Sequence, residues 1–145
     1  MTIPELSNLA PGSPAATILV VEDEPLLRFT LAMELNQAGL RVREAASVDE
    51  AETVLAAGAR IDLIVTDIEL AGSRSGLELA QAVRSLHPHI RVIVVSANTP
   101  EPDITGIADA FFGKPYDINR LIQRIRDLLG QELQHSAGWR QTPIL

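Results

Sequence analysis

Five short apolar runs, separated by helical patterns, constrain the fold of this 145-residue chain more than any other feature. The runs are rich in Val, Ile and Leu with few polar interruptions, which is typical of strands covered on both faces. We expect strands at residues 17–21, 40–45, 61–66, 90–95 and 110–112. Strands that alternate with helices are joined by right-handed crossovers, so the sequence predicts an α/β fold with a parallel five-stranded sheet between two helical layers.

Helical patterns fill the intervals between these runs. We expect helices at residues 25–38, 47–57, 76–86 and 117–129, with a short one after the proline-rich stretch 98–103. Pro25 suits the first turn of its helix, and Ser47 is a typical N-cap residue. Gly39, Gly58 and Gly130 each follow a helical segment, a position at which glycine ends many helices.

One domain accounts for most of the chain. The length fits a single domain of ordinary size. The content of 46% hydrophobic and 21% charged residues is typical of a soluble globular protein. Residues 1–16, rich in Pro, Ser and Ala, predict a flexible leader. We expect the domain at residues 17–130 and a C-terminal tail at residues 131–145.

Composition excludes several classes of function. Twelve Lys and Arg against nineteen Asp and Glu give a net charge of −7, which argues against nucleic acid binding because phosphate contacts need a basic surface. The chain has no cysteine, so disulfides and cysteine-ligated zinc are ruled out. No apolar run approaches the roughly 20 residues that span a membrane, and there is no signal peptide pattern. We therefore expect a cytoplasmic protein without membrane contact.

Polar residues follow four of the five predicted strands. Glu22 and Asp23 come after the first strand, Asp67 after the third, Ser96 after the fourth and Lys114 shortly after the fifth. Ligands of open parallel sheets bind beyond the carboxyl ends of the strands, so we expect these side chains to share one site.

The residue types at this edge favour phosphoryl transfer. Converging carboxylates repel one another and raise one another's pKa. A hard divalent cation relieves that repulsion, and Mg²⁺ prefers a few carboxylates with water and phosphate oxygens. We expect Mg²⁺, with Mn²⁺ as an alternative ion. Positioning and charge neutralisation carry most of such catalysis, and an aspartate can be the nucleophile that forms an acyl phosphate.

These residues stand in segments that resemble the receiver domain of two-component response regulators. The segments are ILVVEDEPLLR at 18–28, DLIVTDIEL at 62–70, VIVVSAN at 92–98 and FFGKPYD at 111–117. The similarity covers residues 17–130. It implies a flavodoxin-like (βα)5 fold with a doubly wound parallel sheet of strand order 2-1-3-4-5.

The resemblance also implies a role for each carboxylate. Asp67 would accept a phosphoryl group from the phosphohistidine of a histidine kinase. Asp23 and Asp67 would bind Mg²⁺ through their side chains, with the main-chain carbonyl of Glu69 as a further ligand. Glu22 stands where the family often has Asp and would act on the metal indirectly, through water and charge.

The remaining positions of the motif would act on the phosphoryl group or respond to it. Lys114 would pair with the phosphoryl oxygens, and Ser96 would donate a hydrogen bond to one of them. Phe111 matches the aromatic switch position but lacks a hydroxyl, and it is equally consistent with a purely structural core role. The Lys114–Pro115 bond is expected to be cis, a form that only X-Pro bonds adopt at low cost.

Two departures from the family pattern affect the surroundings of the site. The loop at residues 71–76 lacks the proline of the usual Pro-Gly-x-x-Gly pattern and is one residue longer. Prolines in the stretch 98–103 limit the expected fourth helix to about two turns. Glu69 and Asn98 are expected to border the path of a hydrolytic water.

The functional prediction is a single-domain response regulator that catalyses only its own aspartyl phosphorylation and dephosphorylation. Expected partners are a histidine kinase or histidine phosphotransfer protein and a downstream protein target, with the chain a monomer or a phosphorylation-linked homodimer. It would switch protein–protein interaction or relay phosphate, because the tail is too short for an output domain. Alternatives are a phosphate sink, a degenerate receiver, an Asp-nucleophile phosphatase and a flavodoxin-like cofactor binder.

Overall fold

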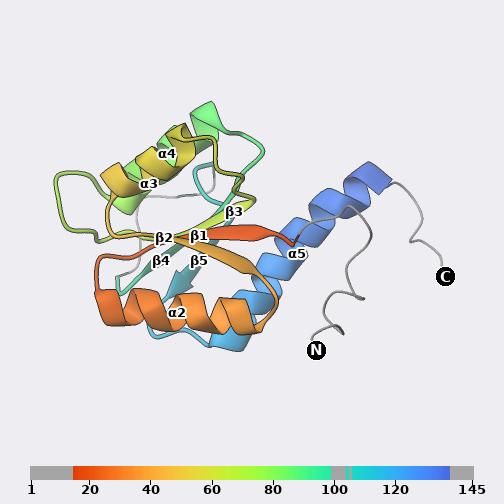
Figure 1. Cartoon of the computed structure of the whole chain (residues 1–145), viewed down its shortest axis with the longest axis horizontal. Coiled ribbons are helices and arrows are strands. Elements are labelled where there is room, and N and C mark those ends of the chain that lie inside the picture. Colours follow the sequence, from red (N-terminus) through yellow and green to blue (C-terminus); the bar gives the residue numbers. More distant parts are fainter. Residues whose placement is uncertain (1–14, 99–103, 105, 138–145) are drawn as a thin grey trace.

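A five-stranded parallel sheet forms the centre of the molecule (Figure 1). The computed structural model describes residues 15–98, 104 and 106–137, with side chains as far as residue 130. The strands are β1 (Thr17–Val21), β2 (Arg41–Ala45), β3 (Leu63–Asp67), β4 (Arg91–Ser96) and β5 (Ala110–Gly113). Their order in the sheet is β2-β1-β3-β4-β5, and every neighbouring pair is parallel. The predicted flavodoxin-like α/β fold and its strand order are therefore confirmed.

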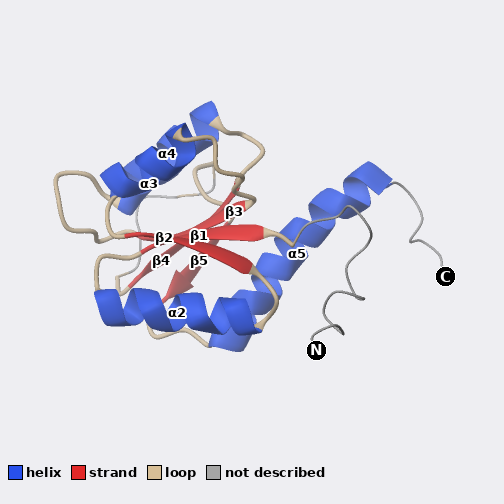
Figure 2. Cartoon of the chain, viewed as in Figure 1, coloured by secondary structure: helices blue, strands red, loops and turns tan. Residues whose placement is uncertain are grey.

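Helices cover both faces of the sheet (Figure 2). They are α2 (Pro25–Gln37), α3 (Val48–Ala56), α4 (Gly76–Leu86) and α5 (Ile118–Ala137). Helices α2 and α5 lie on one face, and α3 and α4 lie on the other (Figure 1). Two apolar clusters match this division, because α2 and α5 pack side chains into one and α3 and α4 into the other. Strands β1, β3 and β4 contribute to both clusters, as strands buried on two faces must.

Local sequence signals account for where three of the helices begin. Glu24 accepts a hydrogen bond from the Leu27 amide at 3.1 Å and caps α2, with Pro25 in its first turn. Ser47 caps α3, and Ser75 caps α4 in a reciprocal capping box. The predicted N-cap at Ser47 is confirmed.

The C-terminal helix is longer than predicted. The expected end at residue 129 was wrong, because α5 continues through Gly130 to Ala137. A glycine inside a helix costs only about 1 kcal/mol relative to alanine. The following residues Gln131, Glu132 and Leu133 are good helix formers and offset that cost.

The first turn of α2 is less buried than its apolar pattern suggests. Leu31 and Leu35 are buried, whereas Leu26 and Leu27 are 69% and 50% exposed. Helical spacing identifies an apolar stripe but not how far the sheet extends beneath it.

Several expectations fall outside the described residues. The leader lies outside them except for residues 15 and 16, and so do residues 138–145 of the tail. Most of the stretch expected to lead into and form the fourth helix, residues 99–103 and 105, is also outside, and residues 104 and 106–109 contain turns and no helix. Within the described part of the chain, no helix is both long and apolar enough to cross a membrane.

Candidate functional site

The carboxyl ends of the strands bring the predicted site residues together. Asp67 is the last residue of β3 and Ser96 the last residue of β4. Glu22 and Asp23 follow β1 directly, and Lys114 follows β5. Because all five strands are parallel, their last residues meet at one edge of the sheet.

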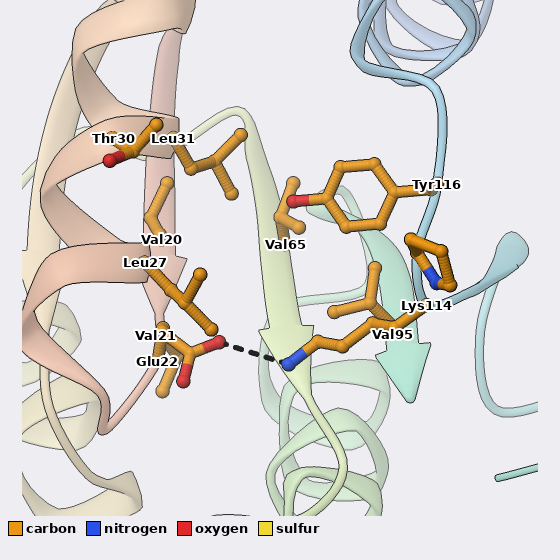
Figure 3. Close-up of a pocket in the computed structure, with 11 residues that line it drawn as sticks. Val20, Val21, Glu22, Leu27, Thr30, Leu31, Val65, Val95, Lys114 and Tyr116 are labelled. Carbon is orange, nitrogen blue, oxygen red and sulfur yellow. Dashed lines mark hydrogen bonds and ion pairs between the residues drawn. The ribbon is translucent and has the colours of Figure 1, made fainter. Parts of the chain in front are cut away.

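Lys114 connects two of the carboxylates. Its ammonium nitrogen lies 2.5 Å from Asp67 Oδ2 and 3.3 Å from Glu22 Oε1. Asp67 is 3% exposed and Glu22 7% exposed, so both carboxylates are almost entirely removed from water. Figure 3 shows Lys114 extending from the loop after β5 to Glu22 at the end of β1. The Lys114–Pro115 bond is cis, as predicted.

Burial and charge shift the proton affinities of this cluster. Burial raises the pKa of Glu22, and the nearby charge of Asp67 adds to the effect, although Lys114 and the Glu24 amide oppose it. Burial alone would lower the pKa of Lys114, but its hydrogen bond and attraction to Asp67, with help from Glu22, raise it. Lys114 is therefore a permanent cation at the site at neutral pH.

The loop after β3 is attached to two carboxylates. The Glu69 amide donates to Asp67 Oδ1 at 3.1 Å, and the Ala71 amide donates to Asp23 Oδ2 at 2.9 Å. Asp67 is thus held through both of its oxygens, one by an amide and one by Lys114. This arrangement fixes the orientation of the Asp67 carboxylate at the mouth of the site.

Gly76 lies very close to the backbone of Asp67, a contact that the sequence did not predict. A Cβ at this position would lie 1.8 Å from the Asp67 carbonyl oxygen and 2.9 Å from Thr66 Oγ1. Thr66 itself donates to the same carbonyl at 2.9 Å. Glycine is a poor helix former, so its presence in the first turn of the predicted helix 76–86 was the sequence signal that a side chain does not fit at this position.

Ser96 contacts Glu69 rather than Asp67. Its hydroxyl donates to Glu69 Oε2 at 2.6 Å and accepts from the Asn98 amide at 3.0 Å. The Asn98 side chain lies at 3.5 Å from the same Glu69 oxygen. Partial burial raises the pKa of Glu69, but hydrogen bonding with Ser96, then with Asp67 and Asn98, outweighs burial and lowers the pKa. Glu69 and Asn98 therefore lie beside Ser96, and their expected place along the path of a hydrolytic water stays a prediction.

Phe111 lies on β5 next to the fourth strand. It is partly buried against the apolar cluster under α3 and α4, and its register partner on β4 is Val94. Ser96 pairs with Gly113 in the same ladder, and the Lys114 amide donates to the Ser96 carbonyl at 2.8 Å. The backbones of Ser96, Lys114 and Phe111 are therefore parts of one hydrogen-bonded pair of strands.

The oxygen donors at the site fit a hard divalent cation. Among the described residues no three Asp, Glu or His side chains are grouped closely enough to hold a metal by themselves. Mg²⁺ needs only one or two carboxylates and fills its other positions with water and substrate oxygens. Asp23 accepts the Ala71 amide through one oxygen, and each Asp67 oxygen accepts one hydrogen bond. Both carboxylates therefore keep lone pairs for a cation, because a carboxylate has about four acceptor positions.

A pocket lies beside the Glu22–Lys114 pair. Its volume is about 400 Å³, and its walls come from the ends of β1, β3 and β4, from α2 and from the loop after β5. Figure 3 shows Tyr116 pointing across this pocket toward α2, where Leu27 and Leu31 form the opposite wall. The pocket therefore borders Glu22 and Lys114 on the side of α2, and Asp23 and Asp67 are not among its lining residues.

Comparisons with curated proteins identify relatives in two-component signalling. The sensor kinase CckA of Brucella abortus is 32% identical over 125 residues, which cover 83% of this chain and 13% of the kinase. The probable transcriptional regulatory protein TcrX of Mycobacterium tuberculosis is 33% identical, with 83% and 52% covered. The nitrogen assimilation regulatory protein NtrX of Azorhizobium caulinodans is 36% identical, with 74% and 25% covered. The chain thus spans about half or less of the length of these relatives.

Solved structures share the same fold. The response regulator TrrA of Thermotoga maritima, solved in complex with Mg²⁺ and BeF, has a TM-score of 0.72 and 30% identity, with 78% of this chain and 98% of that chain covered. A CheY-like receiver domain protein of Methanospirillum hungatei has a TM-score of 0.78 at 23% identity, with 84% and 99% covered. The second likeness concerns the fold alone.

A family match covers the sheet from the second residue of β1 onward and the first nine residues of α5. The response regulator receiver domain family matches residues 18–126, which include the end of every strand that contributes to the site. The chain therefore belongs to the response regulator receiver domain family of two-component signalling.

Proposed function

We propose that Asp67 accepts a phosphoryl group from the phosphohistidine of a histidine kinase or histidine phosphotransfer protein. One observation carries this proposal: a carboxylate at the end of a central strand is 3% exposed and is held by the Glu69 amide on one oxygen and by Lys114 on the other. A carboxylate oriented in this way is preorganised as a nucleophile.

The transfer exchanges one bond of phosphorus for another. A carboxylate oxygen of Asp67 forms a new P–O bond while the P–N bond of the phosphohistidine breaks, and the imidazole nitrogen keeps the electron pair of the broken bond. The product is an acyl phosphate on Asp67. Lys114, already 2.5 Å from Asp67 Oδ2, neutralises the charge that collects on the phosphoryl oxygens.

Asp23 and Asp67 would hold Mg²⁺ or Mn²⁺, with the main-chain carbonyl of Glu69 as a third protein ligand. Bound there, the ion would neutralise phosphoryl charge and align the donor with Asp67. Glu22 lies 3.3 Å from the Lys114 ammonium nitrogen, which supports an indirect role through charge. The complex of the Thermotoga relative with Mg²⁺ and BeF supports this assignment.

Ser96 and Phe111 are the proposed switch residues. Ser96 would leave Glu69 and donate its hydroxyl to a phosphoryl oxygen. Its backbone is bonded to that of Lys114, and its strand pairs with the one that carries Phe111, so a shift of Ser96 reaches the packing of Phe111. The result would be a change in protein–protein interaction or onward relay of the phosphoryl group, with a monomer or phosphorylation-linked homodimer as the acting form.

Intact mass spectrometry tests the acceptor assignment. The parent chain, Asp67→Asn and the control Asp62→Asn are incubated with acetyl phosphate and Mg²⁺. Asp62 precedes the opposite end of β3 and accepts from the Thr17 amide, so its variant controls for the loss of a carboxylate. We expect one added phosphoryl group in the parent and in Asp62→Asn, none in Asp67→Asn, and none when the metal is chelated. An added group in Asp67→Asn would refute the assignment.

A further inference from the structure

The hydroxyl of Ser96 is fully engaged in the structure. A serine hydroxyl has one proton to donate, and that proton lies on the 2.6 Å bond to Glu69 Oε2. The hydroxyl oxygen accepts from the Asn98 amide at 3.0 Å. Ser96 is 1% exposed, so water does not offer it an alternative partner. Any new acceptor for this proton must displace Glu69.

Glu69 connects the acceptor and Ser96 through different atoms. Its main-chain amide donates to Asp67 Oδ1 at 3.1 Å, while its carboxylate accepts from Ser96. The Asn98 side-chain nitrogen approaches the same carboxylate oxygen at 3.5 Å. The Glu69 carboxylate thereby attaches the end of β4 to the loop after β3. A phosphoryl group on Asp67 would compete with Glu69 for the Ser96 proton.

We propose that the Glu69 carboxylate is a latch that holds Ser96 in the position it has while Asp67 is unphosphorylated. The hydrogen bond between them then sets the free-energy cost of moving Ser96 to a phosphoryl group on Asp67. This inference rests on the proposed function of Asp67 as the acceptor. Phosphorylation would then be an exchange of hydrogen bonds, in which the Ser96 proton moves from a carboxylate oxygen to a phosphoryl oxygen. Glu69 acts through Ser96 and is a positioning residue.

Two physical effects make the latch oppose the phosphorylated state. Hydrogen bonds to ionised groups are about twice as strong as those between neutral groups, so releasing Ser96 from Glu69 is costly. The phosphoryl group would also add negative charge beside the Glu69 carboxylate, and like charges at short range repel. Removing the Glu69 side chain relieves both effects, whereas its expected metal ligand, the main-chain carbonyl, stays in place.

A double-mutant cycle separates the latch from the charge. Beryllofluoride with Mg²⁺ stands in for the phosphoryl group, and titration calorimetry measures its affinity for the parent, Glu69→Gln and Glu69→Ala. The glutamine keeps a hydrogen-bond acceptor for Ser96 without the charge, so it is the matched control for repulsion. The same three residues at position 69 are then compared in a Ser96→Ala background.

The latch predicts a difference between the two variants that depends on Ser96. With Ser96 present, Glu69→Ala should bind beryllofluoride roughly threefold to tenfold more tightly than Glu69→Gln, the range expected for one neutral hydrogen bond. In the Ser96→Ala background the two variants should bind equally. A ratio that is the same in both backgrounds would overturn the proposal, because Glu69 would then act without Ser96.

A second measurement needs neither metal nor phosphoryl group. Hydrogen exchange of the Asn98 amide, which donates to Ser96 Oγ, is followed in the unmodified protein. It should become faster in Glu69→Ala and stay near the parent rate in Glu69→Gln. If the parent fails to bind beryllofluoride, the acceptor function fails, and the exchange rate still tests the latch. An unchanged Asn98 rate in Glu69→Ala would contradict it.

Discussion

At the scale of single residues, Lys114 is the cation that contacts both buried carboxylates of the site. It lies between Asp67 and Glu22, two carboxylates that are almost completely buried. Replacing it with methionine keeps the aliphatic stem and leaves both carboxylates without their cation. We expect Lys114→Met to lower the free energy of unfolding by about 1–3 kcal/mol, the cost of leaving a buried polar group without its partner.

Urea unfolding at neutral pH measures this effect against a surface pair. Arg60 pairs with Asp62 at 3.2 Å, and the Arg60 side chain is 56% exposed. Arg60→Met should change the free energy of unfolding by less than about 1 kcal/mol, since exposed ion pairs contribute little. Equal losses in the two variants would show that the burial of the carboxylates at the site is energetically unimportant.

Glu22 gives the site a pH dependence of definite sign. Burial raises its pKa in the folded protein above the ordinary value of 4.5, so the folded state binds this proton more readily than the unfolded chain does. The ionised form therefore lowers stability above the folded-state pKa. That cost is relieved as the pH falls from the folded-state pKa to the unfolded value.

Glu22→Gln tests that sign. Glutamine imitates the neutral, protonated acid. It keeps one oxygen as an acceptor, whereas the Glu24 amide and Lys114 bind different oxygens of Glu22. We expect the variant to have a higher free energy of unfolding than the parent at neutral pH and the same value below pH 4.5. Unfolding curves across this pH range check it. A variant less stable than the parent at neutral pH would mean that the attraction to Lys114 outweighs burial.

At the scale of elements, the start of α4 depends on the absence of a side chain at Gly76. A Cβ there would lie 1.8 Å from the carbonyl oxygen of Asp67, which is backbone and cannot rotate away. Gly76→Ala must therefore move the first turn of α4 or the end of β3. We expect a loss of about 1–3 kcal/mol in the free energy of unfolding, typical of overpacking, together with slower phosphorylation by acetyl phosphate.

Gly130 is the matched control in another helix. It lies inside α5 without a positive φ, and a Cβ added there would meet nothing within 4 Å. Gly130→Ala should raise the free energy of unfolding by up to about 1 kcal/mol through helix propensity alone. Thermal unfolding of both variants compares the two glycines directly. A stabilising Gly76→Ala would contradict the close approach at Asp67.

At the scale of the whole molecule, metal binding at Asp23 and Asp67 is coupled to the free energy of unfolding. A ligand that binds only the folded state stabilises it by RT ln(1 + [L]/Kd). Mg²⁺ at about ten times its Kd should therefore add about 1.4 kcal/mol to the free energy of unfolding, and chelation should remove it. Asp23→Asn should abolish the gain. Asp127→Asn, on helix α5, should retain it, and thermal melts with and without Mg²⁺ distinguish the two.

Much of the fold could be predicted because its signals are local. Apolar runs located all five strands, and cap residues such as Ser47 located helix starts. The end of α5 could not be located in this way. A glycine ends a helix where the backbone turns to positive φ, as at Gly39 and Gly58, whereas Gly130 keeps a helical backbone inside α5. The exposure of Leu26 and Leu27 was also beyond local pattern, because helical spacing does not show which turns of a helix the rest of the fold covers.

The sequence by itself determined which groups reach the site. The alternation of strands and helices makes the sheet parallel, and a parallel sheet brings Asp67, Ser96 and Lys114 to one edge whatever the details of packing. Only the tertiary structure decided which of these groups contact one another. Lys114 binds Asp67 and Glu22, while Ser96 binds Glu69, because loop conformation and side-chain rotamers fix distances of a few ångströms that no spacing along the chain encodes.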